Sequence, residues 1–465
     1  MKFRKMVVLC LCVAFSKCAS STVFVRWSDA KVPPASSLGV GDIVFAWEPG
    51  AAPARLAIAR KQGYRAYVET RLEQAPVAAK ACAEALCTGI ILDGTESVET
   101  EKSLAGLRST YPKLRFLALN ANGKQPQMRG SLVIKRDSVL EVSSPTMQPW
   151  IDTNLALIRV EQRSRQQQVP LYSFAWNDEA QHRTLTADDY SLALAEAGAF
   201  HADFVLPMDD DLQRALSRQD SQAWALWNQV RAFLKFSNDA RVGSWEPAAN
   251  VAVVVDQPDF SDEVLNLLSR HNIPFQVFLA ADLKTAELKG FDIVIVFAKA
   301  DAESAERINR LATAGSIIVI VDAHGRYPWQ STPAVSVNQH TTSYVVGSGR
   351  VLELAEPVSD PETFAQDIRR LLGKNNSLLS LWNGLTTIAV PYRNHDGAMT
   401  LLEFMNYAGE PVRLQVQVKG SFANVRYETP EHGCCTSLAP VEHNGFTEFV
   451  IPELRITGRI HLDAR

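Results

Sequence analysis

Short apolar runs alternate with amphipathic stretches from about residue 41 to residue 236. The runs are rich in Val, Ile, Leu and Phe at consecutive positions, so both of their faces are apolar, as in strands buried within a parallel sheet. We therefore expect seven buried strands in this part of the chain. They are Asp42–Trp47, Tyr64–Val68, Gly89–Leu92, Leu114–Leu119, Ser131–Ile134, Pro170–Trp176 and Asp203–Leu206.

The stretches between these runs have helical patterns. They are Pro53–Gln62, Leu72–Leu86, Met147–Gln167 and Asp188–Phe200, the last preceded by Thr186 as an N-cap. Repeated strand–helix units predict a parallel sheet with right-handed crossovers. Seven such strands favour a (β/α)8-like barrel over residues 21–240, closed by an eighth strand at Thr22–Trp27 or left incomplete. The alternative is an open doubly wound sheet, but no GxGxxG or GxxxxGK[ST] motif follows any strand.

A second α/β pattern begins after Asn238–Glu246 and predicts a flavodoxin-like domain over residues 247–375. From residue 376 to residue 465 the helical pattern stops. Short strands such as Met399–Asn406 and Val412–Lys419, separated by turns, predict an antiparallel β-sandwich there. The elements expected in the flavodoxin-like domain are the strands Val251–Val255, Phe275–Leu279, Phe291–Phe297 and Ser316–Val321 and the helices Ser261–His271 and Ala302–Ala314.

Residues 1–20 have the pattern of a signal peptide. The basic residues Lys2, Arg4 and Lys5 precede the ten-residue apolar run Met6–Phe15. That run is too short to span a bilayer, and the combination is typical of an export signal. No other apolar stretch of the chain is long enough for a membrane helix.

We expect cleavage near Ala19 or Ser20 and a periplasmic or extracellular protein. Lipid anchoring through Cys18 is the alternative. The net charge of −4, without a basic block, argues against nucleic-acid binding.

Removal of that segment leaves four cysteines, Cys82, Cys87, Cys434 and Cys435. No CxxC motif or His/Cys cluster has the spacing of a zinc site. The sequence therefore predicts neither a structural metal nor a cofactor.

Carboxylates, amides and tryptophans follow most of the expected barrel strands, at the end where barrel enzymes place their active sites. Glycoside hydrolysis needs two carboxyl groups, and tryptophan faces stack on sugar rings. Asp93 is the first catalytic candidate because it ends a buried strand and precedes Gly94, which permits a tight turn. Its candidate partners are, in order, Asp209, Glu48 and Asp178. Glu69 also ends a strand but is given no role. The candidate substrate-binding residues are Trp47, Trp176, Asn120, Asn177 and Glu96.

Several segments resemble known families. Residues 247–375 resemble in topology the glutamine-amidotransferase-like trimerisation domain of some β-galactosidases, although the absence of any cysteine between Cys87 and Cys434 excludes amidotransferase chemistry. Leu402–Val412 is similar to the closing sandwich of multidomain glycoside hydrolases. Val169–Asp210 is similar to the barrel segment of hyaluronidase-like enzymes, without their Asp-X-Glu motif. The resemblance implies a carbohydrate substrate and a homo-oligomer formed through the flavodoxin-like domain.

Two hypotheses follow. One is an exported glycoside hydrolase that works through strand-end carboxylates. The other is a catalytically inactive carbohydrate-binding or scaffold protein of the cell envelope. Two carboxyl groups about 5 to 10 Å apart in one cleft favour the enzyme, and a lone acid favours the binding protein.

Overall fold

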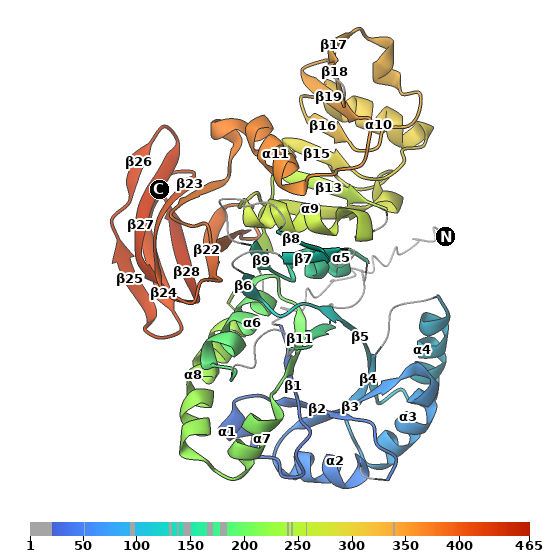
Figure 1. Ribbon diagram of the computed structural model, residues 1–465, viewed down its shortest axis with the longest axis vertical. Helices are drawn as coiled ribbons and strands as arrows, with labels where there is room; N and C mark the ends of the chain where they lie inside the picture. The colour runs from blue at the N-terminus through green and yellow to red at the C-terminus, as the bar shows by residue number, and fades with distance from the viewer. Residues whose placement is uncertain are drawn as a thin grey trace, which may run out of the picture.

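The computed structural model describes residues 21–50, 52–93, 98–129, 133–136, 139–142, 150–164, 171–176, 184–239, 241–242, 245–256, 258–337 and 340–465. It contains a parallel barrel, a flavodoxin-like α/β unit at the other end of the molecule, and an antiparallel sandwich at the side (Figure 1). The fold class predicted from the sequence is confirmed.

Seven parallel strands close the barrel in the order β1-β11-β10-β5-β4-β3-β2, so the open doubly wound alternative is wrong. The closing strand expected near the start of the chain is present as β1. The strands are β1 (Val23–Arg26), β2 (Asp42–Ala46), β3 (Arg65–Arg71), β4 (Gly89–Asp93), β5 (Arg115–Gly123), β10 (Leu171–Phe174) and β11 (Asp203–Pro207). The helices are α1 (Ala35–Leu38), α2 (Ala52–Lys61), η1 (Leu72–Gln74), α3 (Ala75–Glu84), α4 (Val98–Thr110), α5 (Leu155–Ser164), α6 (Ala187–Ala199), α7 (Asp210–Ser217) and α8 (Ser221–Ser237).

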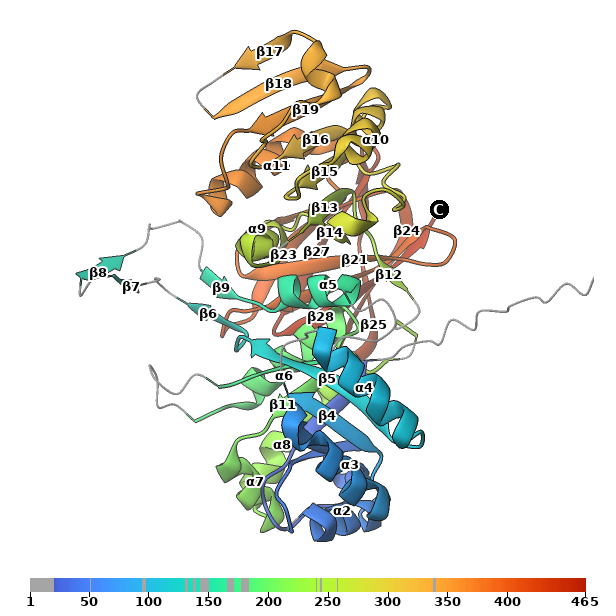
Figure 2. The same cartoon turned by 90° about the vertical axis from the view of Figure 1, so that its right-hand side faces the viewer.

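One run expected as a barrel strand lies elsewhere. Of the expected strand Ser131–Ile134, the described residues Val133 and Ile134 belong to β7 (Val133–Arg136), which pairs with β8 (Val139–Val142) in a hairpin outside the barrel (Figure 2). The connection between these two strands is too short for a crossover, so only antiparallel pairing is possible. The prediction of a barrel strand here is therefore wrong.

The helix expected over Met147–Gln167 is shorter than predicted in the part that the structure describes. Helix α5 begins at Leu155, and the preceding strand β9 (Trp150–Asp152) pairs with β6 (Gln127–Arg129). Tertiary pairing overrides the helical pattern there.

The α/β unit has the strand order β14-β13-β15-β16-β19, followed by the antiparallel strands β18 and β17. The five parallel strands have the 2-1-3-4-5 order of flavodoxin-like folds. Helices α9 and α11 cover one face of the sheet, and α10 covers the other. The elements are β13 (Val251–Val255), α9 (Pro258–Arg270), β14 (Phe275–Leu279), η2 (Ala280–Asp282), β15 (Ile293–Val296), α10 (Ala302–Thr313), β16 (Ile317–Ile320), η3 (Pro328–Ser331), β17 (Ala334–Val337), β18 (Thr341–Val346), β19 (Gly349–Leu354) and α11 (Pro361–Asn376).

The sandwich consists of a six-stranded sheet, β12-β21-β22-β28-β24-β25, and a four-stranded sheet, β20-β23-β27-β26. Apolar residues such as Phe404, Val416 and Ile460 form its core. Strand β12 comes from the segment that follows the barrel, so this connection is part of the larger sheet. The strands are β12 (Glu246–Pro247), β20 (Leu379–Trp382), β21 (Thr387–Arg393), β22 (Met399–Asn406), β23 (Val412–Lys419), β24 (Phe422–Thr429), β25 (Gly433–Leu438), β26 (Val441–His443), β27 (Phe446–Leu454) and β28 (Thr457–Ala464).

The larger sheet packs along α6 of the barrel. Tyr407 donates its hydroxyl to the carboxylate of Glu196 at 2.8 Å, and Tyr392 donates to the carbonyl of Ala199. The backbone N–H of Asn154 donates to the same Glu196 carboxylate at 2.9 Å, so this buried acid connects three segments. Burial is the main cause that raises the pKa of Glu196. Among the described residues, no helix has both the length and the apolar character needed to cross a membrane.

Candidate functional site at the carboxyl ends of the barrel strands

One apolar layer identifies the inner face of the barrel. This layer has one buried residue from each strand. Because side chains alternate along a strand, the residue two positions after a layer residue also faces into the barrel. Toward the carboxyl ends, the charged residues on this face are Arg26, Glu69 and Asp93. Each strand contributes one buried residue to the apolar layer: Phe24, Val44, Tyr67, Ile91, Leu119, Leu171 and Val205.

Arg26 and Glu69 form a bidentate ion pair near the carboxyl ends. The Nε and Nη2 atoms of Arg26 each donate to a different carboxylate oxygen of Glu69, both at 2.9 Å. The side chain of Glu69 is 15% exposed and that of Arg26 is 32% exposed, so water and solutes reach the pair. Paired parallel bonds of this kind fix the orientation of a carboxylate.

Asp93 shares the inward register with Glu69 on the neighbouring strand. Glu69 pairs with Ile91, and Asp93 lies two positions further along β4. Asp93 itself is exposed at the end of its strand. The two acids are therefore diagonal neighbours on the inner face, with Glu69 held by arginine and Asp93 open to solvent.

The other predicted acids that the structure describes lie in different surroundings. Asp209 is the N-cap of α7, and its carboxylate accepts from the backbone N–H of Leu212 at 3.0 Å. Glu48 is exposed and lies 3.6 Å from Arg55 of α2. The predicted site residues that lie outside the described residues are Asp178, Asn177 and Glu96.

The two predicted tryptophans have structural contacts. Trp176 donates its indole N–H to the carbonyl of Pro207 at 2.6 Å and makes an edge contact with the ring of Tyr190. Trp47 is half-buried against the barrel core. Both rings therefore pack on the protein at this end of the barrel, and neither stands free in solvent.

The predicted amide Asn120 belongs to the outer register of its strand. It directly follows the inward residue Leu119 on β5, so its side chain leaves the barrel on the opposite face. There it donates its amide to the carboxylate of Glu161 on α5 at 2.9 Å. The alternation therefore separates Asn120 from the inward-facing Asp93.

Sequence reasoning placed Glu69 at a strand end without a role, and it missed Arg26. The signal for Glu69 was the alternation within RAYVETR, which places Tyr67 and Glu69 on one face. Arg26 could not be paired with Glu69 from the sequence, because barrel closure brings β1 and β3 to either side of β2.

The amino ends of the strands carry a second charged layer, in which the carboxylates are buried and the arginines are exposed. Arg65 donates to the buried carboxylate of Asp42 at 2.5 Å, and Arg115 donates to the Tyr67 hydroxyl at 3.0 Å. Asp203 accepts from a backbone N–H just before β1 at 2.6 Å. Burial raises the pKa of Asp42 and raises the pKa of Asp203 to about 6. Barrel enzymes place their chemistry at the opposite end, so this layer is interpreted as structural.

A shallow hollow lies where the three parts of the molecule meet. Pro247, Ile273, Pro274 and Pro391 are among the residues that line it, and no carboxylate is among them. It therefore lacks the acids that glycoside hydrolysis requires. Within the described part of the chain, potential metal ligands gather on the sandwich, at Glu428, Cys434, Cys435 and His461.

No protein-family profile and no curated protein matches the chain. Among solved structures, it is similar to alpha-L-fucosidase isoenzyme 2 from Paenibacillus thiaminolyticus, with a TM-score of 0.58 and 12% sequence identity over 96% of this chain and 100% of that chain. It also matches a GH42 beta-galactosidase from G. stearothermophilus with a TM-score of 0.41 and 10% identity, over 85% of this chain and 68% of that one.

The likeness to the fucosidase extends over almost the whole length of both chains. The resemblance of residues 247–375 to an amidotransferase-like trimerisation domain is not tested by these matches and stays a prediction. At 12% identity the likeness concerns the fold, and the chain therefore has the fold of that glycoside hydrolase.

Proposed function

We propose that this protein is a glycoside hydrolase that acts on a glycan at the carboxyl ends of the barrel strands. The observation that carries the proposal is the placement of Glu69, held by Arg26, beside Asp93 on one inner face. Two carboxyl groups in different surroundings are what this chemistry requires. The similarity to a fucosidase structure supports the fold that this site needs.

The two acids have different roles in this proposal. Glu69 keeps both oxygens as acceptors for Arg26, which suits a nucleophile or a base. Asp93 is exposed, so a bound sugar ring would cover it. A carboxyl group in direct contact with the bound sugar can donate a proton to the leaving-group oxygen, as a general acid does.

A second candidate function is glycan binding without catalysis. Two candidate acids already have partners in the protein, which favours this function. Glu69 is paired with Arg26, and Asp209 caps α7. If Arg26 does not release Glu69 when substrate binds, Asp93 is the one remaining acid among the described residues that face inward at this end, and glycoside hydrolysis needs two groups.

One experiment separates the two functions. The full-length protein is incubated with aryl glycosides, including fucosides and galactosides, and with polysaccharides, and the released product is measured. Asp93→Asn protein prepared in the same way is the control for contaminating hydrolases. Binding to the same glycans is measured by calorimetry. Turnover supports the hydrolase, and binding without turnover supports the binding protein. The absence of both turnover and binding would contradict both functions.

We also propose that the protein is exported. The basic and apolar pattern of residues 1–20 supports export. The two disulfides, Cys82–Cys87 and Cys434–Cys435, support it as well, because disulfides persist in oxidising compartments.

Removal of the export signal can be measured directly. Mass spectrometry of the protein recovered from outside the cytoplasm should find an N-terminus near Ser20 or Ser21. An intact Met1 in that material would contradict cleavage.

Association through the flavodoxin-like unit is a proposal as well. Its sheet ends at β17, whose residues Val335 and Val337 are 63% and 70% exposed. An exposed apolar edge strand can pair with a second copy. Light scattering of the purified full-length protein should give a mass above that of one chain, and a monomer at high concentration would contradict it.

A further inference from the structure

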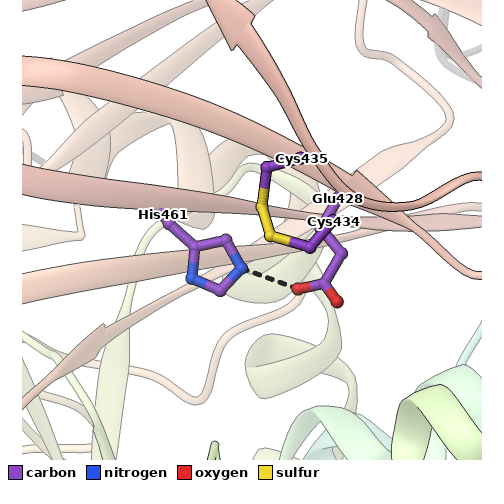
Figure 3. Close-up of side chains that lie close together, drawn as sticks. All are labelled: Glu428, Cys434, Cys435 and His461. Atoms are coloured by element: carbon purple, nitrogen blue, oxygen red, sulfur yellow. Dashed lines mark hydrogen bonds and ion pairs between the residues drawn. A yellow bond between two sulfur atoms is a disulfide. The ribbon is translucent and has the colours of Figure 1, made fainter.

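Three strands of the sandwich bring together two cysteines, a histidine and a glutamate. Glu428 lies on β24, Cys434 and Cys435 lie on β25, and His461 lies on β28 (Figure 3). One ligand atom from each of the four side chains lies within 4.8 Å of the others. The group belongs to the sandwich, so it is separate from the proposed glycan site in the barrel.

Sheet register accounts for one half of this group. Strand β24 lies between β28 and β25, and Glu428 pairs with Arg459 while Arg426 pairs with His461. Glu428 and His461 are therefore diagonal neighbours on one face. The Nε2 atom of His461 lies 2.7 Å from a carboxylate oxygen of Glu428.

A β-bulge accounts for the other half. Tyr427 pairs with Thr436 and Glu428 pairs with Cys434, so Cys435 is an extra residue on β25. In a regular strand, adjacent side chains point to opposite faces. The bulge changes the direction of one of them, and both sulfur atoms join the same group, where the cysteines form a disulfide.

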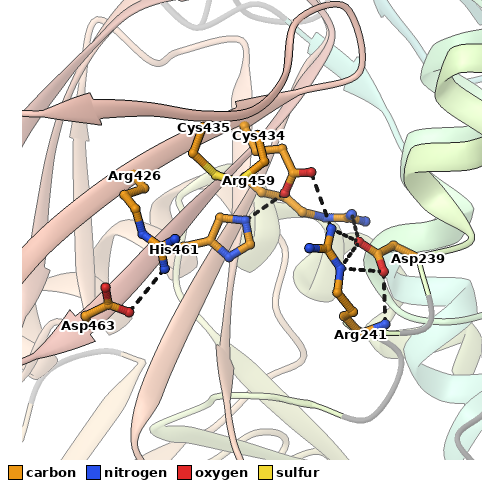
Figure 4. Close-up of a disulfide and its surroundings, with 9 residues drawn as sticks. Asp239, Arg241, Arg426, Cys434, Cys435, Arg459, His461 and Asp463 are labelled. Carbon is orange, nitrogen blue, oxygen red and sulfur yellow. Dashed lines mark hydrogen bonds and ion pairs between the residues drawn. A yellow bond between two sulfur atoms is a disulfide. The ribbon is translucent and has the colours of Figure 1, made fainter.

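An arginine lies beside this group of four side chains, and one of its cysteines is exposed to solvent. Arg241 lies 3.5 Å from Glu428 and also contacts Asp239 (Figure 4). The side chain of Glu428 is 9% exposed and that of His461 is 15% exposed, whereas Cys434 is at the surface. A solute can therefore approach from the cysteine side and meet the two less exposed donors behind it.

We propose that, once the Cys434–Cys435 disulfide is reduced, the cysteines together with His461 and Glu428 bind one divalent cation of the Zn²⁺ class. Two thiolates, one imidazole and one carboxylate oxygen form a four-coordinate donor set that suits such an ion. With the histidine neutral, the donor set carries three negative charges. A bound divalent cation reduces this to one net negative charge, and the guanidinium of Arg241 lies 3.5 Å from the Glu428 carboxylate.

The reaction balances with a dithiol as the reductant. The dithiol gives two electrons and two protons to the disulfide, the S–S bond breaks, two protein thiols form, and the dithiol becomes a disulfide. The cation then binds the two thiols as thiolates and releases their two protons. In the reverse exchange, the oxidised dithiol takes up the two electrons and two protons, the protein S–S bond re-forms, and the cation is released because the thiolate is the ligand form of cysteine.

The other disulfide provides a matched control. The sulfur atoms of Cys82 and Cys87 lie 3.6 and 3.5 Å from the carbonyl oxygen of Gly89. In the part of the chain that the structure describes, these two cysteines belong to no group of potential metal ligands. Reduction of that disulfide gives two thiols that no histidine or carboxylate among the described residues joins in such a group.

The test uses Co²⁺ as a spectroscopic probe for the Zn²⁺ site. The parent protein is the full chain with Cys10, Cys12 and Cys18 replaced by serine, which leaves the four cysteines of the two disulfides. It is reduced with dithiothreitol, desalted without oxygen and titrated with Co²⁺. We expect one ion per chain, with a thiolate-to-cobalt absorption band in the near ultraviolet and the intense visible bands of tetrahedral Co²⁺. The oxidised protein should show neither, and excess Zn²⁺ should remove both.

Paired cysteine substitutions assign the sulfur ligands. The double variant Cys434→Ser/Cys435→Ser should lose the bands, whereas Cys82→Ser/Cys87→Ser should retain them. Circular dichroism checks folding. If the first double variant does not fold, alkylation of the reduced parent thiols is a second way to remove the sulfur ligands.

Two single substitutions assign the remaining ligands. His461→Asn and Glu428→Gln should each weaken Co²⁺ binding by at least about tenfold, because each replaces an imidazole or carboxylate donor by a neutral amide, which is a weaker ligand. Competition with a chelator of known affinity measures the change.

Three results would overturn the proposal. They are the absence of tetrahedral thiolate bands in the reduced parent protein, bands that survive the loss or alkylation of Cys434 and Cys435, and affinities unchanged by both His461→Asn and Glu428→Gln.

Discussion

The two ends of the barrel carry similar charged residues in different environments. At the amino ends, the carboxylates of Asp42 and Asp203 are buried, and burial raises the pKa of both. At the carboxyl ends, Arg26 and Glu69 are partly exposed and Asp93 is open to solvent. The inward alternation of the strands is the same at both ends, so the difference is one of burial.

This difference separates groups that serve folding from groups that can serve a ligand. A buried carboxylate without full compensation lowers stability, and it cannot meet a substrate. An exposed carboxylate costs little and can be covered by a ligand. Substitutions at the two ends should therefore divide into those that change stability and those that change activity.

Asp93→Asn at the carboxyl ends should have the greatest consequence. If Asp93 is the general acid, kcat should fall about a thousandfold, roughly 4 kcal/mol of barrier, while the unfolding free energy changes little because Asp93 is exposed. Steady-state kinetics on the best glycan and urea unfolding measure the two quantities. More than about a tenth of the wild-type activity in this variant would remove Asp93 from the mechanism.

Asp203→Asn at the amino ends should instead change stability and leave activity unchanged. Burial raises the pKa of Asp203 from 3.8 to about 6, so the folded state binds a proton more tightly than the unfolded state. The stability contributed by this proton is fully present below pH 3.8 and is lost as the pH rises through about 6, a loss of about 3 kcal/mol.

The Asn variant should therefore be more stable than the wild type at neutral pH. Its stability should also depend less on pH between about 4 and 6, with kcat unchanged. Urea unfolding across this pH range is the measurement. Equal pH slopes in the two proteins would show that Asp203 titrates normally.

A matched pair of arginine substitutions compares the ends directly. Arg65→Met removes the ion partner of the buried Asp42 and should lower the unfolding free energy by roughly 2 kcal/mol. Arg26→Met breaks the pair whose carboxylate is the more exposed, Glu69 at 15% against Asp42 at 4%. It should cost less than about 1 kcal/mol, but it should change kcat or KM. Equal losses of stability would mean that burial does not distinguish the two ends.

Substitutions of Asp209 should have the smallest effects on activity and stability. Asp209→Ala removes the N-cap of α7 and should cost about 1 kcal/mol, whereas Asp209→Asn should cost a few tenths because Asn also caps helices. Neither variant should change kcat by more than a factor of a few. A loss of activity in Asp209→Asn comparable to that in Asp93→Asn would restore Asp209 as the catalytic partner.

Much of the fold followed from local pattern. The runs DIVFA and GIILD are apolar at consecutive positions and form barrel strands, and VAVVV forms a buried strand of the flavodoxin-like sheet. Thr186 precedes α6 and forms a capping box with Asp189. Each of these signals lies within one segment, so no knowledge of the rest of the chain is needed.

The candidate site followed from the sequence only in part. Asp93 could be placed at the end of its strand from the run that precedes it. The pairing of Arg26 with Glu69 and the exclusion of Val133 and Ile134 from the barrel could not be predicted in this way. Both depend on which strands are neighbours, and a run of apolar residues does not specify its neighbour.

The order of the three parts, most of the strands and the place of Asp93 are thus properties of the linear pattern. Strand neighbours, register and the gathering of Cys434, Cys435, Glu428 and His461 from three strands belong to the packed chain. The physical reason is distance along the sequence. A side-chain pattern reports which face of its own strand is buried, whereas contacts between distant strands form only after barrel closure and sheet pairing fix strand order and register.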